Sequence, residues 1–140
     1  MIWVVDASVA IKWFVEEELC EAAEQLLVSE TLLCAPDFIL VEVSGIAWKK
    51  AIRRELSHDQ AFAIAAELRQ GRIVLNSPAD LIERALQIAL SLNHSIYDCL
   101  YLACAEDVGG IMVTADRRLC TKVEGTEFGE LIRYLEDATA

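Results

Sequence analysis

Residues 95–116 read SIYDCLYLACAEDVGGIMVTAD, and they contain a helix, a sharp break and a strand in immediate succession. Ser95 is a favoured N-cap residue, and the mostly apolar residues after it predict a helix to about Asp107. A glycine pair then breaks the chain, and residues 111–114 form a short apolar run typical of a buried strand. A helix followed directly by a buried strand is typical of α/β proteins.

The same alternation continues on both sides of this stretch. Apolar runs predict strands at 2–5, 32–35 and 72–75, whereas 131–135 is ambiguous between strand and helix. Helical patterns occur at 8–15, 19–29, 38–54, 57–70, 78–92 and 116–122. We therefore predict a three-layer α/β/α sandwich with a mostly parallel central sheet, formed by a single domain over residues 1–140.

Two of these helices carry clear start signals. Ser57 and Gln60 have the spacing of a capping box. Ser77 is a good N-cap residue, and Pro78 suits the first helical position. The helix after Pro78 is predicted to have one apolar face, formed by Ile82, Leu86, Ala89 and Leu92.

Composition excludes several classes of protein. The chain has 140 residues, of which 55% are hydrophobic, so it can bury a core of its own. No apolar run approaches the roughly 20 residues of a membrane span, and the N-terminus lacks the features of a signal peptide. The five cysteines are odd in number and lack C-x-x-C spacing, which favours reduced thiols in a cytoplasmic protein.

The net charge of −11 is unusual for a protein that binds nucleic acid. Two interpretations remain open: the acids include a cluster that binds cations, or the partner is not nucleic acid. Local basic runs favour the first interpretation, although each run also fits an ordinary solvated helix face. The runs are Lys49-Lys50 with Arg53-Arg54, Arg69 with Arg72, and Arg117-Arg118 with Lys122.

Three aspartates are candidates for one shared site. Asp6 directly follows the strand at 2–5, and Asp116 follows the strand at 111–114. Both therefore lie at carboxyl ends of predicted strands, which is where ligands bind in parallel sheets. Asp98 lies in the first turn of its helix, and that turn is expected on the same side of the sheet.

Glu42 is a fourth candidate, for a different reason. It shares a helix face with the apolar residues Phe38 and Ile46. An ionised carboxylate is costly on such a face unless it is paired or bound to a metal. A salt bridge to a distant Lys or Arg is the alternative explanation.

Each aspartate also has a purely local explanation. Asp6 and Asp116 could be helix N-caps, and Asp98 fits the third position of a capping box begun by Ser95. The conjunction favours a site, because four acids can meet at one pole without an obvious basic partner nearby. Carboxylates that lie close together require a counter-charge, so the pattern predicts bound cations.

The other polar residues refine this prediction. A site with only oxygen ligands selects hard ions, Mg²⁺ or Mn²⁺, over zinc. Ser8 and Thr114 place hydroxyls beside two of the acids, where they could bond to carboxylates, water or phosphate, or cap helices. His58 and His94 are not at ligand spacing, and we expect His94 to be a plain surface residue. Hard-metal carboxylate sites suit phosphodiester hydrolysis.

Four segments of the chain resemble the PIN domain, and more closely the VapC-type toxins of bacterial and archaeal toxin–antitoxin pairs. They are IWVVDASVAIKWFVEE at 2–17, FILVEVSGIAWKK at 38–50, HSIYDCLYLACAEDVGG at 94–110 and MVTADRRL at 112–119. The segments occur in the family's order and span nearly the whole chain, and the last two together are the most specific. The resemblance implies a metal-dependent endoribonuclease on a Rossmann-like α/β/α fold.

The resemblance also implies roles for individual residues. The family's acidic quartet, which binds the metal, corresponds to Asp6, Glu42, Asp98 and Asp116, with Ser8 and Thr114 in support. Such toxins typically form homodimers and are silenced by a cognate antitoxin whose tail enters the active site. Many relatives carry a further acid or Asn soon after the fourth acid. Here Arg117-Arg118-Leu119-Cys120 follow, so no fifth ligand is assigned.

We therefore expect hydrolysis of RNA phosphodiesters that depends on Mg²⁺ or Mn²⁺, with Glu42 binding a metal or orienting the attacking water. Lys12, Arg117 and Arg118 are candidates for contacts to the RNA backbone. A magnesium-dependent phosphatase is an alternative, but Ser8 stands where an aspartyl-phosphate mechanism requires a second Asp. A PIN-like module that binds a partner without catalysis, and a nuclease that acts on DNA, also remain open.

Large aromatic residues are numerous for a small domain. We expect most of them in the core and some at an interface with a second copy or an antitoxin, where Trp is favoured. They are Trp3, Trp13, Trp48, Phe14 and Phe38.

Overall fold

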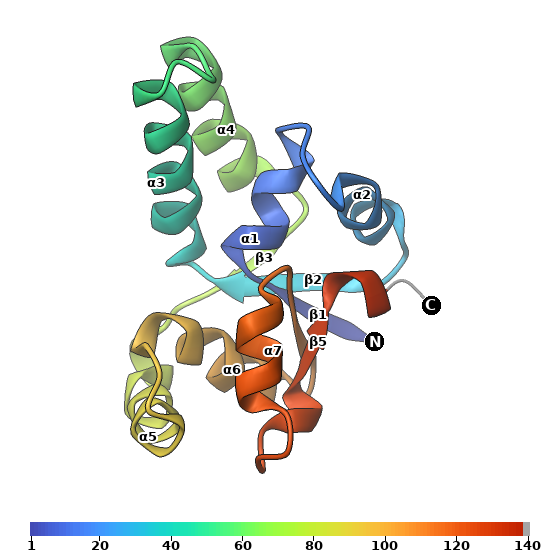
Figure 1. The fold of residues 1–140 in the computed structure, drawn as a ribbon, viewed down its shortest axis with the longest axis vertical. Helices are drawn as coiled ribbons and strands as arrows, with labels where there is room; N and C mark the ends of the chain where they lie inside the picture. Colours follow the sequence, from blue (N-terminus) through green and yellow to red (C-terminus); the bar gives the residue numbers. More distant parts are fainter. Residues whose placement is uncertain (139–140) are drawn as a thin grey trace.

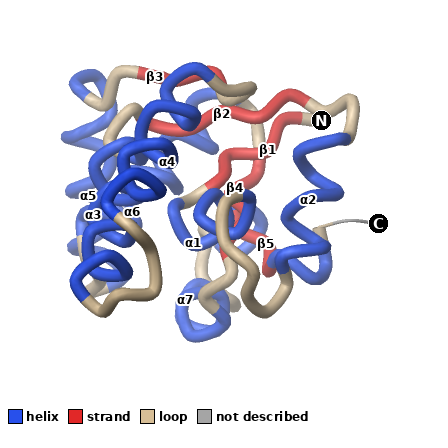
Figure 2. The backbone as a smooth tube through the Cα atoms, turned by 90° about the horizontal axis from the view of Figure 1, so that it is seen from above, coloured by secondary structure: helices blue, strands red, loops and turns tan. Residues whose placement is uncertain are grey.

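A computed structural model describes residues 1–138, which contain a five-stranded parallel sheet with helices on both faces (Figure 1). The strands are β1 (Ile2–Val5), β2 (Leu32–Pro36), β3 (Val74–Asn76), β4 (Ile111–Thr114) and β5 (Ile132–Tyr134). Their order across the sheet is β3-β2-β1-β4-β5, so β1 lies in the middle (Figure 2). Every neighbouring pair is parallel, which confirms the predicted fold class.

Seven α-helices connect the strands. They are α1 (Ala7–Ala10), α2 (Cys20–Val28), α3 (Ile39–Ile52), α4 (His58–Gln70), α5 (Ile82–Leu92), α6 (Ile96–Val108) and α7 (Arg117–Val123). In Figure 1, α1 to α4 lie above the sheet, whereas α5 and α6 lie below it. Short 3₁₀ segments occur at Ile11–Trp13, Ala79–Leu81, Gly129–Leu131 and Leu135–Asp137. Across residues 1–138, no helix has both the length and the apolar character that crossing a membrane requires.

Helix α6 is deeply buried, and the way it ends explains the glycine pair. Seven consecutive residues, 99–105, are buried beneath the sheet. Gly109 caps the helix with a φ of 67°, a conformation that favours glycine. A Cβ atom on Gly110 would lie 2.6 Å from the backbone oxygen of Ile2, so β4 can approach β1 only with glycine there.

Several boundaries differ from the sequence-based expectations. The helix predicted at 8–15 is α1 followed by a 3₁₀ turn, and the ambiguous segment at 131–135 contains strand β5. The capping box between Ser57 and Gln60 is confirmed at the start of α4. After Pro78 the chain first forms a 3₁₀ turn, and α5 begins only at Ile82.

The predicted apolar face of α5 is correct for Ala89 and Leu92 and wrong for Ile82 and Leu86. Its buried residues are Ala85, Ile88, Ala89 and Leu92. Ile82 and Leu86 are 48% and 47% exposed, and Leu90 beside them is 76% exposed. This helix is apolar on two sides, so spacing alone does not identify the side that packs.

The aromatic residues divide between core and surface. Trp3 is buried, whereas Trp13, Phe14 and Phe38 are half-buried. Trp48 is 61% exposed on α3, which together with α4 forms a helical pair that projects from the sheet (Figure 1). Trp3 therefore lies in the core and Trp13, Phe14 and Phe38 pack against it, whereas Trp48 is the ring left for an interface.

Candidate active site

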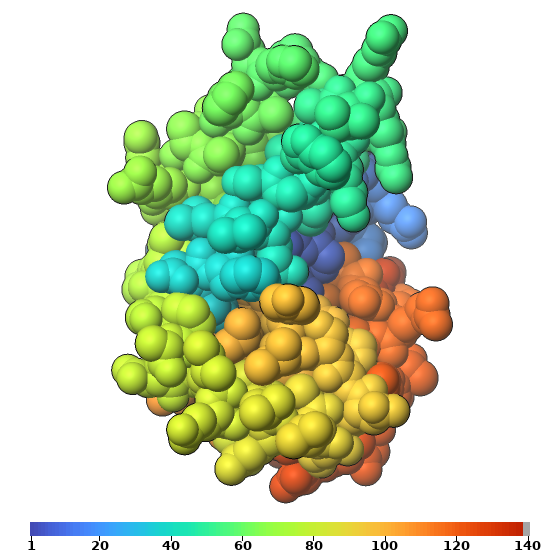
Figure 3. Space-filling model, turned by 90° about the vertical axis from the view of Figure 1, so that its left-hand side faces the viewer, coloured from blue at the N-terminus to red at the C-terminus, as the bar shows by residue number. Residues whose placement is uncertain are grey.

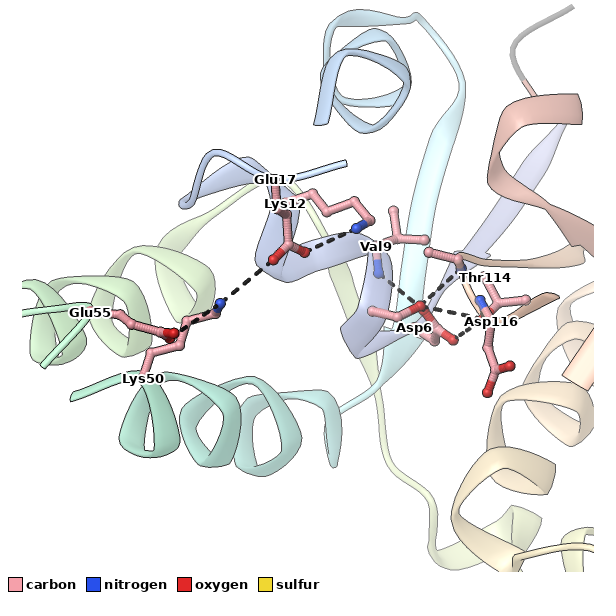
Figure 4. A network of polar contacts seen from close by, with 10 residues as sticks. Asp6, Val9, Lys12, Glu17, Lys50, Glu55, Thr114 and Asp116 are labelled. Carbon is pink, nitrogen blue, oxygen red and sulfur yellow. Dashed lines mark hydrogen bonds and ion pairs between the residues drawn. The ribbon is translucent and has the colours of Figure 1, made fainter. Parts of the chain in front are cut away.

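Asp6 and Asp116 meet at the carboxyl edge of the sheet because their strands are neighbours. Val5 of β1 is paired with Val113 of β4, and each aspartate follows its strand within three residues. Figure 4 shows both side chains close together at the start of α1 and α7. The space-filling view shows the dark-blue N-terminal segment in a recess between α3 and the orange segments that contain α6 and α7 (Figure 3).

Asp6 is buried and is held by three donors. Its carboxylate accepts hydrogen bonds from the Ser8 hydroxyl at 2.6 Å, the Val9 amide at 3.1 Å and the Thr114 hydroxyl at 2.5 Å. Burial raises the pKa of Asp6 to about 6, although these donors oppose the shift, and the charge of Asp98 raises the pKa further. Burial therefore outweighs the three hydrogen bonds in setting the pKa of this carboxyl group.

Ser8 and Thr114 connect the two strand ends. The Ala115 amide donates to the Ser8 hydroxyl oxygen at 2.9 Å, and the Asp116 amide donates to the Thr114 hydroxyl oxygen at 3.1 Å. The two hydroxyl oxygens are 3.3 Å apart. Both residues therefore position the acids, and the expected bond to a carboxylate is present at Asp6.

The capping explanation for Asp6 and Asp116 is also correct. Asp6 caps α1 through the Val9 amide, and Asp116 caps α7 through the Leu119 amide at 3.0 Å. In each case the cap uses Oδ1. The Oδ2 atom of Asp116 makes no hydrogen bond within residues 1–138, so capping leaves that oxygen available.

Glu42 faces α6 from the first turn of α3. Its Oε1 accepts a hydrogen bond from the hydroxyl of Tyr101, a residue that is 1% exposed. Burial raises the pKa of Glu42, the Tyr101 bond opposes this, and the charge of Asp98 adds to it. Among residues 1–138 no Lys or Arg forms an ion pair with Glu42, so the salt-bridge alternative is not observed.

Asp98 is bonded to a residue that sequence reasoning misjudged. Its Oδ2 lies 2.6 Å from Nε2 of His94, whose side chain is only 20% exposed. The prediction of a plain surface histidine is therefore wrong. Asp98 does not complete a capping box either, because the Ser95 hydroxyl accepts from the Tyr97 amide. The i,i+4 spacing of His94 and Asp98 was the available signal.

Electrostatics couples the acids although they are not closely packed. Asp98 raises the pKa of both Asp6 and Glu42, so their charges repel across the recess. Within residues 1–138 no Lys or Arg pairs with any of the four acids, and no three His, Cys, Asp or Glu side chains converge at metal-binding distance. Carboxylate oxygens are the donors that hard divalent cations prefer, and a cation among these spaced acids would keep part of its water shell.

The three basic candidates differ in availability. Lys12 is buried and bonded to Glu17 at 2.9 Å, in a network that extends to Lys50 (Figure 4). The Arg117 guanidinium lies 4.0 Å from the centre of the Tyr134 ring. Arg118 makes no hydrogen bond or ion pair with the described residues. Lys12 is therefore unsuited to contacting RNA, which corrects that expectation.

An open groove of about 690 Å³ begins at Asp116. Its walls include His94 from the turn before α6 and Arg117, Arg118, Thr121 and Lys122 from α7. The groove thus adjoins the acids and has basic residues along one side.

A parallel α/β/α sheet with acids gathered at its carboxyl edge defines the class of PIN-type domains. The chain belongs to the PIN-domain family, because the PIN domain matches residues 3–124. The chain is 35% identical to Ribonuclease VapC3 from Pyrobaculum aerophilum over 121 residues, which cover 85% of this chain and 92% of that protein. The resemblance to VapC-type proteins is thereby confirmed.

Two solved structures share the fold. PAE2754 from Pyrobaculum aerophilum superposes with a TM-score of 0.71 at 21% identity, covering 99% of this chain and 87% of the other. Mycobacterium tuberculosis VapC20, described as a sarcin–ricin-loop-cleaving toxin, has a TM-score of 0.65 at 19% identity, covering 90% of this chain and 92% of the other. At these identities both comparisons concern the fold alone.

Proposed function

We propose that this protein is an endoribonuclease that hydrolyses RNA phosphodiester bonds, and that it is the toxin of a type II toxin–antitoxin pair. The observation that carries the proposal is the acidic quartet. Asp6 and Asp116 lie close together at the carboxyl edge of the sheet (Figure 4), and the charge of Asp98 acts on both Asp6 and Glu42. Among the described residues no Lys or Arg pairs with any of these four acids. The 35% identity to a VapC ribonuclease supports RNA as the substrate.

The same four acids are the proposed ligands of Mg²⁺ or Mn²⁺, bound directly or through water. A bound cation of this kind lowers the pKa of water and neutralises charge on the reacting phosphate. The burial of Asp6 supports the assignment, since an ionised carboxylate in the interior is costly unless it is paired or bound to a metal. Donors from Ser8, Val9 and Thr114 hold Asp6 in one orientation.

Glu42 is the proposed orienting group for the attacking water. Tyr101 engages Oε1, and Oε2 makes no hydrogen bond within residues 1–138, so it can accept one from water. His94 likewise engages one oxygen of Asp98, its Oδ2. A catalytically inactive binding module, by contrast, does not require carboxylates that are held in place by hydrogen bonds.

A homodimer and a cognate antitoxin are the proposed protein partners. Exposed apolar residues support partners of this kind, because large apolar side chains on a surface mark interaction sites when they cluster. One such group lies on α5, at Ile82, Leu86 and Leu90. A second lies on α3 and α4, at Trp48, Ile52 and Phe62. Light scattering of the isolated protein tests the homodimer.

An Asp98→Asn substitution tests the nuclease. We expect it to reduce RNA cleavage in Mg²⁺ or Mn²⁺ at least about a hundredfold, because a ligand and its charge are lost. Asp107→Asn is the matched control, since Asp107 is an exposed acid at the other end of the same helix. Equal cleavage by the Asp98 variant and the parent would refute the proposal. Hydrolysis of a phosphate monoester with no cleavage of RNA would instead support the phosphatase alternative.

A further inference from the structure

The groove beyond Asp116 adjoins the acids and is lined by basic side chains. We propose that it binds the backbone of the RNA strand next to the scissile phosphate, with Arg118 and Lys122 contacting its phosphates. This inference rests on the proposed nuclease function and adds the path of the substrate. The groove has a volume of about 690 Å³, and both cations line it together with Asp116.

The groove is continuous with the site. Asp116 belongs to the acidic quartet and also forms part of the groove wall. His94 has the same double position, because it lines the groove while its Nε2 lies 2.6 Å from Asp98. A strand whose scissile phosphate lies among the acids therefore passes directly between α7 and the turn before α6.

The charge of the groove is opposite to that of the whole chain. The net charge is −11, yet the groove has three cations from α7 and a single acid. A second hollow, beside α3, has the opposite charge. Its charged lining residues are three acids and one cation, namely Glu16, Glu17, Glu55 and Lys50. Contacts to backbone phosphates supply most of the affinity of nucleic-acid binding, so RNA favours the first hollow and is repelled by the second.

The cations of the groove are not equivalent. Arg117 is engaged, because it stacks on Tyr134 and lies 3.7 Å from Glu136. The Lys122 ammonium donates to the backbone oxygen of Asn93 at 2.7 Å, which holds it across the groove and leaves two further donors. Arg118 is exposed and has no partner within residues 1–138. Arg118 and Lys122 are therefore the residues free to bind phosphate.

Binding of a fluorescent single-stranded RNA, measured by anisotropy over a range of salt concentrations, tests this inference. Asp98→Asn serves as the background, so that the RNA stays intact. We expect Arg118→Ala and Lys122→Ala each to raise the Kd about threefold to tenfold at low salt. The double variant is expected to reduce the slope of log K against log salt by about 1.4, or about 0.7 for each lost contact. Arg69→Ala, which removes an exposed cation on α4, is expected to change neither quantity.

Kinetics on the otherwise unaltered protein complete the test. Arg118→Ala is expected to raise KM for RNA and to leave kcat within about twofold of the parent, since the contact is made before and during reaction. The inference is overturned if the double variant binds as tightly as its background, or if Arg69→Ala weakens binding as much. If the parent cleaves RNA and these variants are unaffected, only the assignment of the groove is contradicted. If the parent cleaves no RNA, the proposed function itself is contradicted.

Discussion

The hydroxyl of Tyr101 on helix α6 donates a hydrogen bond to the carboxylate of Glu42 on α3. Tyr101 is 1% exposed and lies one turn beyond Asp98, so both side chains project from the same face of α6. Burial raises the pKa of Glu42 and the hydroxyl lowers it. Tyr101 thus helps Glu42 stay ionised and in place.

A Tyr101→Phe substitution removes this donor and little else. We expect kcat for RNA cleavage to fall about tenfold to a hundredfold, because a hydrogen bond to a charged group contributes about 1.5–3 kcal/mol. The melting temperature reports whether the fold is intact. Tyr97→Phe is the control, since Tyr97 is 56% exposed and its ring, not its hydroxyl, stacks on Phe38. An equal fall in kcat in the two variants would show that the Tyr101 hydroxyl has no specific role.

Residue-scale contacts were predictable only where they are local in sequence. Ser8 and Asp6 are two residues apart, and the hydroxyl was correctly expected beside the acid. The partner of Glu42 is 59 residues away, and no spacing rule reports a contact between helices at that separation. His94 is four residues from Asp98, but a position in a loop predicts an exposed side chain and gives no sign of this contact.

At the scale of elements, the junction between α6 and β4 places Asp116 near Asp6. Gly110 is the last residue of this junction, and a Cβ added to it would lie 2.6 Å from the Ile2 oxygen and 3.1 Å from the Ile2 Cβ. The first of these atoms belongs to the backbone and cannot move aside without disturbing β1. The register between β1 and β4 therefore depends on glycine at this position.

A Gly110→Ala substitution is expected to destabilise the protein by about 3 kcal/mol, the upper end of overpacking effects, because the clash is with backbone. Gly45→Ala is the matched control. Gly45 lies within α3 and has open space around its missing Cβ, so alanine is expected to stabilise the protein by about 0.5–1 kcal/mol. Urea denaturation measures both changes. A Gly110→Ala protein as stable as the parent would show that β1 and β4 can move apart enough to accommodate the added methyl group.

Elements were predicted well where one signal dominated. Strands β1 and β4 are short runs of apolar, β-forming residues, and this composition predicts both. Helix α5 has apolar residues at two sets of helical spacing, and only contact with α6 distinguishes the buried set. Which strands are neighbours was outside the reach of the sequence, since the order β3-β2-β1-β4-β5 arises from crossovers.

At the scale of the whole molecule, the charge of −11 opposes both folding and RNA binding. Divalent cations can relieve this repulsion in two ways. They screen the surface charge in general, and they bind at the acidic quartet in particular. Only binding at the quartet depends on individual carboxylates, so a matched pair of variants separates the two effects.

Removal of divalent metal is therefore expected to lower the melting temperature of the parent. At a Mg²⁺ or Mn²⁺ concentration about 100 times the Kd, binding to the folded state contributes about 2.7 kcal/mol, or roughly 10 °C for a chain of this size. The metal-free sample receives NaCl to the same ionic strength, so that screening is equal. Asp107→Asn, which removes one exposed charge, is expected to keep the full shift, and Asp98→Asn is expected to lose most of it. A shift of equal size in all three proteins would mean that the cations act on surface charge alone, and the metal assignment of the quartet would then be withdrawn.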